Sequence, residues 1–153
     1  MIRQIIRRHG DDAPEKLNGR AQYITIWKPL RGPLHDYPLA LCDRGSLDIQ
    51  CDLEPQDIVD RDEVLENVHV YHRAQHQWRY LSGQQDTELL IFRQADTLPN
   101  GLGEPISPTR ILPRTQAHTV EGTPHCAIRN PAAPVDCLPR ESIEVVAFVY
   151  SHD

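Results

Sequence analysis

The chain has 153 residues, one domain's worth, with 16 Lys and Arg against 22 Asp and Glu, so its formal net charge is −6. An acidic chain without a basic run is a poor ligand for a phosphate backbone, which argues against nucleic acid as a partner. No apolar run approaches the roughly 20 residues that span a bilayer, and Met1 to Arg8 lack the apolar core of a secretory signal. We therefore expect one cytoplasmic domain over residues 1–153, without a membrane partner.

The four cysteines contain no C-x-x-C pair, which favours free thiols over disulfides or a structural zinc site. They are Cys42, Cys51, Cys126 and Cys137.

The apolar pattern near the N-terminus predicts a short broken helix over residues 1–19. Four side chains there share one helical face, at positions i, i+3, i+4 and i+7: Ile2, Ile5, Ile6 and His9. Alternation of period two then predicts a strand over 22–27, which Pro29, Gly32 and Pro33 end. A short buried run follows at 38–42.

The rest of the chain predicts short strands and long connections. Residues 44–66 are acidic and rich in turn formers, which indicates a surface excursion, and residues 94–121 and 130–139 read as loops. Strands are expected at 68–72, 76–81, 87–93, 123–128 and 141–150, the last of them central in its sheet. This pattern predicts a mainly β domain, a double-stranded β-helix of jelly-roll or cupin type. An immunoglobulin-like sandwich is the alternative, disfavoured by the long loops and the lack of a Cys…Trp…Cys pattern.

Two segments carry residues suited to chemistry. Within 76–81, alternation places His76, Trp78 and Tyr80 on one face. In the last strand Arg140 and Ser142 point the same way and offer a guanidinium fork and a hydroxyl to one carboxylate. His125 lies at the start of the preceding short strand. A 2-oxoacid co-substrate is held beside a metal when an Arg and a hydroxyl bind its carboxylate and a nearby imidazole is available to the metal. The alternative is a strand-end salt bridge and a strand-edge histidine.

Four ordered blocks resemble a known family: ITIWKPLRGPLHDYPLALCD (24–43), VYHRAQHQWRYL (70–81), TELLIFRQADT (87–97) and TPHCAIRNPAAPVDCLPRESIEVVAFVY (123–150). They are similar to the C-terminal part of the fungal gibberellin desaturase-like or cephem methoxylase-like hydroxylases and desaturases of secondary metabolism. The resemblance implies a non-haem iron, 2-oxoglutarate-dependent oxygenase. It further implies that His125 is the distal iron ligand and that Arg140 and Ser142 clamp the co-substrate. His76, Trp78 and Tyr80 match the aromatic strand that we expect to line the cavity.

A centre of two histidines and one carboxylate also needs an H-x-D or similar pair before the distal histidine. In the family, that pair matches a segment upstream of Met1. His9-Gly10-Asp11 has the spacing but matches a helix end, so we interpret it as a solvated terminus. His35 and Asp36, like His69 and His72, point to opposite faces of an extended chain, and His118 lies in an expected loop. The sequence thus supplies one metal ligand, His125, without clear partners.

Three functional hypotheses remain open at this point. The first is an oxidoreductase that hydroxylates or desaturates a small natural product with Fe(II) and 2-oxoglutarate. The second is a metal-free isomerase, cyclase or dehydratase in which His125, His76 and Tyr80 transfer protons. The third is a small-molecule carrier or a partner of a full-length homologue.

Two structural expectations accompany these hypotheses. Arg140, Ser142, His125, His76, Trp78 and Tyr80 should line one cavity. The absence of upstream strands would expose sheet edges, which favours a homodimer.

Overall fold

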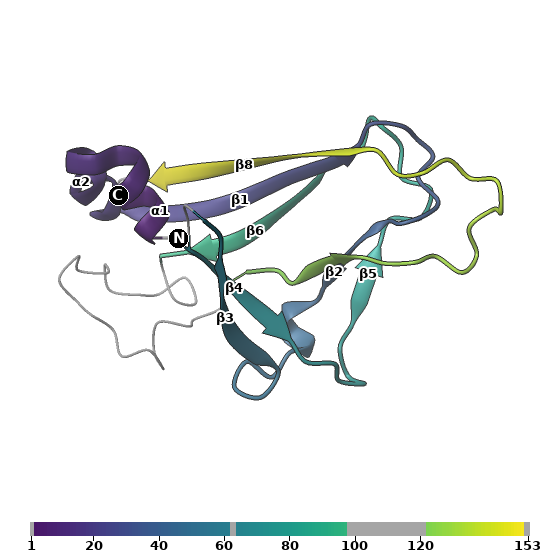
Figure 1. Ribbon diagram of the computed structural model, residues 1–153, viewed down its shortest axis with the longest axis horizontal. Coiled ribbons are helices and arrows are strands. Elements are labelled where there is room, and N and C mark those ends of the chain that lie inside the picture. The colour runs from purple at the N-terminus through teal and green to yellow at the C-terminus, as the bar shows by residue number, and fades with distance from the viewer. Residues whose placement is uncertain (1, 62–63, 98–121, 152–153) are drawn as a thin grey trace.

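The computed structural model describes residues 2–61, 64–97 and 122–151, and this part of the chain is mainly β (Figure 1). Helices occur at the start, as the sequence predicted: α1 (Ile2–His9), the 3₁₀ turn η1 (Gly10–Asp12) and α2 (Ala13–Leu17). A second 3₁₀ turn, η2 (Arg44–Ser46), interrupts the strands. The strands are β1 (Arg20–Pro29), β2 (Leu39–Cys42), β3 (Leu53–Val59), β4 (Val64–Val70), β5 (Trp78–Tyr80), β6 (Leu90–Asp96), β7 (His125–Ala127) and β8 (Ser142–Ser151). None of the described helices has the length and apolar character needed to cross a membrane.

The strands form two three-stranded antiparallel sheets, in the orders β6-β1-β8 and β5-β2-β7, together with the separate β3-β4 hairpin. The first sheet is the upper layer in Figure 1, with β2 and β5 below it. This arrangement is that of a double-stranded β-helix, and the predicted fold class is confirmed. The expectation that the last strand is central is wrong, because β1 pairs along both of its edges and leaves β8 at the edge of the sheet.

The core between the two sheets is built by one face of β1 and the facing residues of β2 and β6. Alternate residues of β1 are buried, including Thr25 at 0% and Trp27 at 4% exposure. The cluster that joins the layers consists of Trp27, Leu34, Leu39 and Phe92, with Leu41 and Leu90 packed against it. A second cluster of Ile5, Ala13, Leu17 and Ala21 fixes the helices against the end of the sheet near the C-terminus (Figure 1).

The opposite face of the β6-β1-β8 sheet is also apolar but is uncovered within the described chain. Ile91 is 63% exposed and Val145 is 54% exposed. Ile143 and Val149, on the same side of the sheet, are similarly exposed to solvent. β8 therefore carries apolar residues on both faces, and only the alternation of burial along β1 shows which face is the inner one.

The expected surface excursion over 44–66 contains an exposed hairpin, β3-β4, that the sequence did not predict. Its strands pair from Leu53 opposite Val70 to Val59 opposite Val64. The strand predicted at 68–72 thus begins earlier, at Val64, and ends at Val70. β3 is exposed along almost its whole length, so the hairpin stands away from both sheets. The acidic and turn-forming residues of this segment obscure the alternation of apolar and polar residues, so the sequence did not indicate two strands here.

Candidate functional site

His125 faces the space between the two sheets. Its partner across the β2-β7 ladder is Leu41, and its ring lies 4.7 Å, between centroids, from that of Phe92 in the other sheet. Its Nδ1 is 2.9 Å from the backbone oxygen of Thr123. Because a carbonyl oxygen only accepts, Nδ1 carries a hydrogen, and in the neutral ring the lone pair is therefore on Nε2. This is the tautomer that metal-binding histidines adopt when a second group orients the ring.

Arg140 and Ser142 lie at the entrance to β8, as the sequence predicted. Ser142 pairs with Pro29 of β1, and the buried side of β1 shows that its face is the inner one. The Arg140 guanidinium lies 5.9 Å from the centroid of the Trp27 ring, and its Nη1 donates to the Tyr37 carbonyl at 2.9 Å. Among the described residues one donor of five is thus used, and the side chain lines a groove of about 760 Å³ beside the 127–140 segment.

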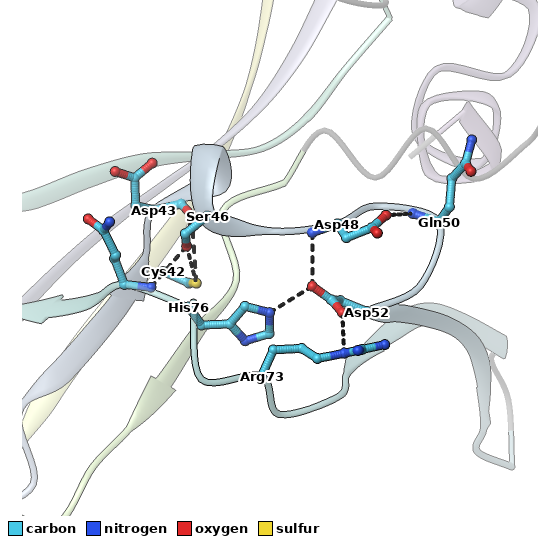
Figure 2. A network of polar contacts seen from close by, with 9 residues as sticks. Cys42, Asp43, Ser46, Asp48, Gln50, Asp52, Arg73 and His76 are labelled. Carbon is cyan, nitrogen blue, oxygen red and sulfur yellow. Dashed lines mark hydrogen bonds and ion pairs between the residues drawn. The ribbon is translucent and has the colours of Figure 1, made fainter.

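His76 does not face the space between the sheets. It precedes β5, its side chain is 1% exposed, and its Nε2 lies 2.8 Å from Oδ2 of Asp52 (Figure 2). A carboxylate accepts, so Nε2 donates and has no lone pair to offer a metal or a substrate. The strand expected at 76–81 accordingly shortens to β5, because the ring turns toward Asp52 instead of continuing the ladder.

Asp52 is the centre of this network, and its side chain is 0% exposed. Oδ2 accepts the backbone N–H of Asp48 at 2.8 Å, and Oδ1 lies 2.9 Å from Nε of Arg73. The hydrogen bond from His76 is the main cause that lowers the pKa of Asp52, helped by Asp48 and Arg73 and opposed by burial. The backbone carbonyl of Asp52 also accepts the backbone N–H of Tyr71 at 2.7 Å, so the network closes the base of the β3-β4 hairpin.

Trp78 and Tyr80 lie opposite Cys42 and Ala40 on β2, on the face away from the Leu41 row, and they are 37% and 43% exposed. The inner position of β5 belongs to Arg79, which lies opposite Leu41. Sequence reasoning missed Arg79 because alternation fixes which residues share a face but not which face is inside. A single arginine between two aromatic residues was the available signal.

The structure therefore does not bring the six expected residues into one cavity. Tyr80 lines a groove of about 430 Å³ between β2, β5 and β6, whereas Arg140 lines the other groove. His125 lies on the inner face beside Leu41, and His76 is enclosed by its own network.

Within the described residues, no three His, Cys, Asp or Glu side chains lie close enough together to hold a metal ion. His9 bonds to the Tyr150 hydroxyl at 2.9 Å, in keeping with its interpretation as a helix end, and Asp36 accepts from the backbone of Asn130. His118 lies outside the described residues. His125 is fit to be one ligand, but a full set is not supplied by the part of the chain described. The four cysteines are free, as predicted.

Comparison with known proteins identifies relatives of this chain. The chain is 32% identical over 150 residues to aspirochlorine biosynthesis protein N of Aspergillus oryzae, covering 97% of this chain and 56% of that protein. It is 28% identical over 143 residues to the Fe(II)/2-oxoglutarate-dependent dioxygenase nvfI of Aspergillus novofumigatus, covering 92% and 45%. The chain spans about half the length of the curated relatives it matches.

A solved structure, the iron and alpha-ketoglutarate-dependent endoperoxidase NvfI, superposes with a TM-score of 0.78 and 26% identity, over 99% of this chain and 50% of that one. A family model described as an oxidoreductase/YMDC permease-like domain matches residues 1–150. With nearly every residue inside that match, the chain belongs to the oxidoreductase/YMDC permease-like domain family.

Proposed function

We propose that this chain is the co-substrate-binding part of an oxidoreductase that hydroxylates or desaturates a small natural product with Fe(II) and 2-oxoglutarate. The relatives that carry iron and 2-oxoglutarate in their names support this assignment. The single observation that supports it most is the place of His125 on the inner face, beside Phe92, with Nδ1 donating to the Thr123 carbonyl so that Nε2 of the neutral ring is available as a ligand.

In this proposal Arg140 and Ser142 bind the distal carboxylate of 2-oxoglutarate. The Trp27 ring and the Tyr37 carbonyl hold the guanidinium in place, so less side-chain entropy is lost when it forms two parallel hydrogen bonds with a carboxylate. The Ser142 hydroxyl, at the first residue of β8 and opposite Pro29 on the inner face, adds a donor.

Iron bound with 2-oxoglutarate supplies oxidising power toward unreactive C–H bonds. The described residues offer only His125 toward it, so we derive no step through the metal and assign the other ligands to residues outside the described ranges. β7 pairs only with β2 in the described chain. A strand added along its free edge would place an H-x-D pair on one face beside His125.

Anaerobic titration of the purified protein with Fe(II) and 2-oxoglutarate tests the proposal, with calorimetry for binding and absorption for the charge-transfer band of chelated 2-oxoglutarate. We expect metal-dependent binding of 2-oxoglutarate that Arg140→Lys weakens and that Arg129→Lys, on the same groove, leaves unchanged. Binding that is equal in all three proteins would contradict the clamp.

A second candidate uses the same imidazole without metal. A neutral His125 whose Nε2 lone pair is open can act as a general base in a lyase or isomerase reaction. A chelator distinguishes the two: turnover of the natural substrate that survives prolonged dialysis against EDTA and still requires His125 supports the metal-free reaction.

The homodimer remains a prediction, supported by the open edges of β7 and β8 in the described chain. Light scattering should report twice the mass of one chain. A monomer at micromolar concentration would contradict it.

A further inference from the structure

The groove of about 430 Å³ between β2, β5 and β6 combines apolar walls with a few polar and charged side chains. Its described lining is mostly apolar, and the two charged side chains among it are Arg79 and Asp43; the others are Leu39, Leu41, Cys42, Tyr80, Leu81 and Leu90. A volume of this size is in the range of small-molecule sites, whose few polar groups fix the orientation of the ligand. The walls therefore favour a compact apolar ligand with one polar group.

Arg79 and His125 occupy the same row of the β5-β2-β7 sheet. Both lie directly opposite Leu41, one on each side, so all three side chains emerge on the inner face. Two strand spacings separate the Arg79 and His125 backbones, which is about 10 Å. A ligand whose polar group contacts Arg79 can thus extend over Leu41 in the direction of His125.

The guanidinium of Arg79 is only lightly engaged by the protein. Its Nη2 donates to Oε1 of Gln77 at 3.1 Å and lies 4.0 Å from Oδ2 of Asp43, and its side chain is 75% exposed. Asp43 is itself occupied, because its Oδ1 accepts the backbone N–H of Gly45 and so caps η2. An exposed pair at that distance is weak, so Arg79 keeps donors for an incoming anion.

We propose that this groove is the substrate site and that Arg79 selects an apolar molecule that carries a carboxylate. The inference rests on the proposed function for its chemistry at His125 and names the substrate class of that site. Arg79 determines specificity by holding the carboxylate, while the leucines hold the hydrocarbon body over Leu41.

Calorimetry with three matched probes tests the selection: adamantane-1-carboxylate, adamantane-1-methanol and protonated adamantane-1-methylamine. The wild-type protein should bind the carboxylate about ten-fold more tightly than the alcohol, and the amine more weakly still. Arg79→Gln should remove the preference for the carboxylate without weakening binding of the alcohol, and Arg79→Lys should keep part of it. Arg31→Gln, which removes another exposed arginine, is the matched control and should change nothing.

Arg140→Gln separates this site from the proposed co-substrate clamp. If Arg140→Gln abolishes the preference and Arg79→Gln does not, the carboxylate is held in the other groove and the inference is overturned. Equal binding of carboxylate and alcohol by the wild type, or no binding of either, also overturns it. Binding of Fe(II) and 2-oxoglutarate, measured on the same samples, reports on the proposed function independently, because that binding can fail while the Arg79 preference persists.

Discussion

His125 begins β7 and His76 lies just before β5 of the same sheet, and their surroundings give them opposite chemistry. His125 lies on the inner face and donates through Nδ1 to a backbone carbonyl, so Nε2 of the neutral ring is not used by that bond. His76 donates through Nε2 to Asp52, with its side chain 1% exposed. The difference shows that the hydrogen-bond partner of the ring, more than its place in a strand, decides whether a histidine can serve a site.

The hydrogen-bond partners of the two histidine rings also differ in charge and in the structure that they hold together. A carbonyl fixes the ring of His125 without adding charge, whereas Asp52 is buried, ionised and tied to Arg73 and Asp48. Because the second network also closes the base of the β3-β4 hairpin, we assign His76 to stability and His125 to the site.

The largest expected effect is on chemistry at His125. His125→Ala should lower iron-dependent consumption of 2-oxoglutarate by at least about 100-fold while leaving the thermal midpoint nearly unchanged. The exposed His72 supplies the control, since His72→Ala should alter neither quantity. Undiminished turnover in the His125→Ala variant would contradict both the iron-dependent and the metal-free mechanism.

The next effect concerns folding at His76. His76→Ala removes the main hydrogen bond to a buried carboxylate, so we expect a loss of about 2–3 kcal/mol in the free energy of unfolding. Turnover per folded molecule should stay at the wild-type level. Urea denaturation followed by circular dichroism measures the first quantity. A variant of normal stability with reduced turnover would reverse the assignment of the two histidines.

A smaller effect is expected on co-substrate affinity at Arg140. Arg140→Lys replaces a planar fork with a point charge and loses the arrangement over Trp27, so binding of 2-oxoglutarate should weaken about ten-fold. Calorimetry gives the affinity, and the His76→Ala protein provides a useful contrast because its affinity should not change.

The smallest effect is a dependence of stability on pH that comes from Asp52. Its pKa is lowered in the folded chain, so the unfolded state binds the proton more readily and the carboxylate stabilises the fold above its unfolded pKa of about 4. That contribution should disappear as the pH falls through the lower, folded pKa. Urea midpoints from pH 7 to pH 2 should show the gap between wild type and Asp52→Asn closing below pH 4. A gap that stays constant with pH would show that Asp52 acts by packing alone.

Much of the architecture was predictable because it depends on local patterns. The alternation in β1 and β8 and the helical spacing before Gly19 gave the mainly β class and the N-terminal helices. The shared orientation of Arg140 and Ser142 stays a prediction, since β8 begins at Ser142 and Arg140 precedes it. The role of His125 as an iron ligand came from the resemblance to a family and stays a prediction, while the structure places the residue on the inner face.

Three features were decided only by tertiary structure. Period two fixes which residues of β5 share a face, but the pairing with β2 decides that Arg79 points inward and Trp78 and Tyr80 do not. β8 is apolar on both faces, so its place at the sheet edge follows from how β1 pairs and not from its own composition. The burial of His76 depends on Asp52, which is 24 residues away in the sequence. A local pattern sets the relative direction of neighbouring side chains, whereas the partner that each side meets is set by contacts between distant segments.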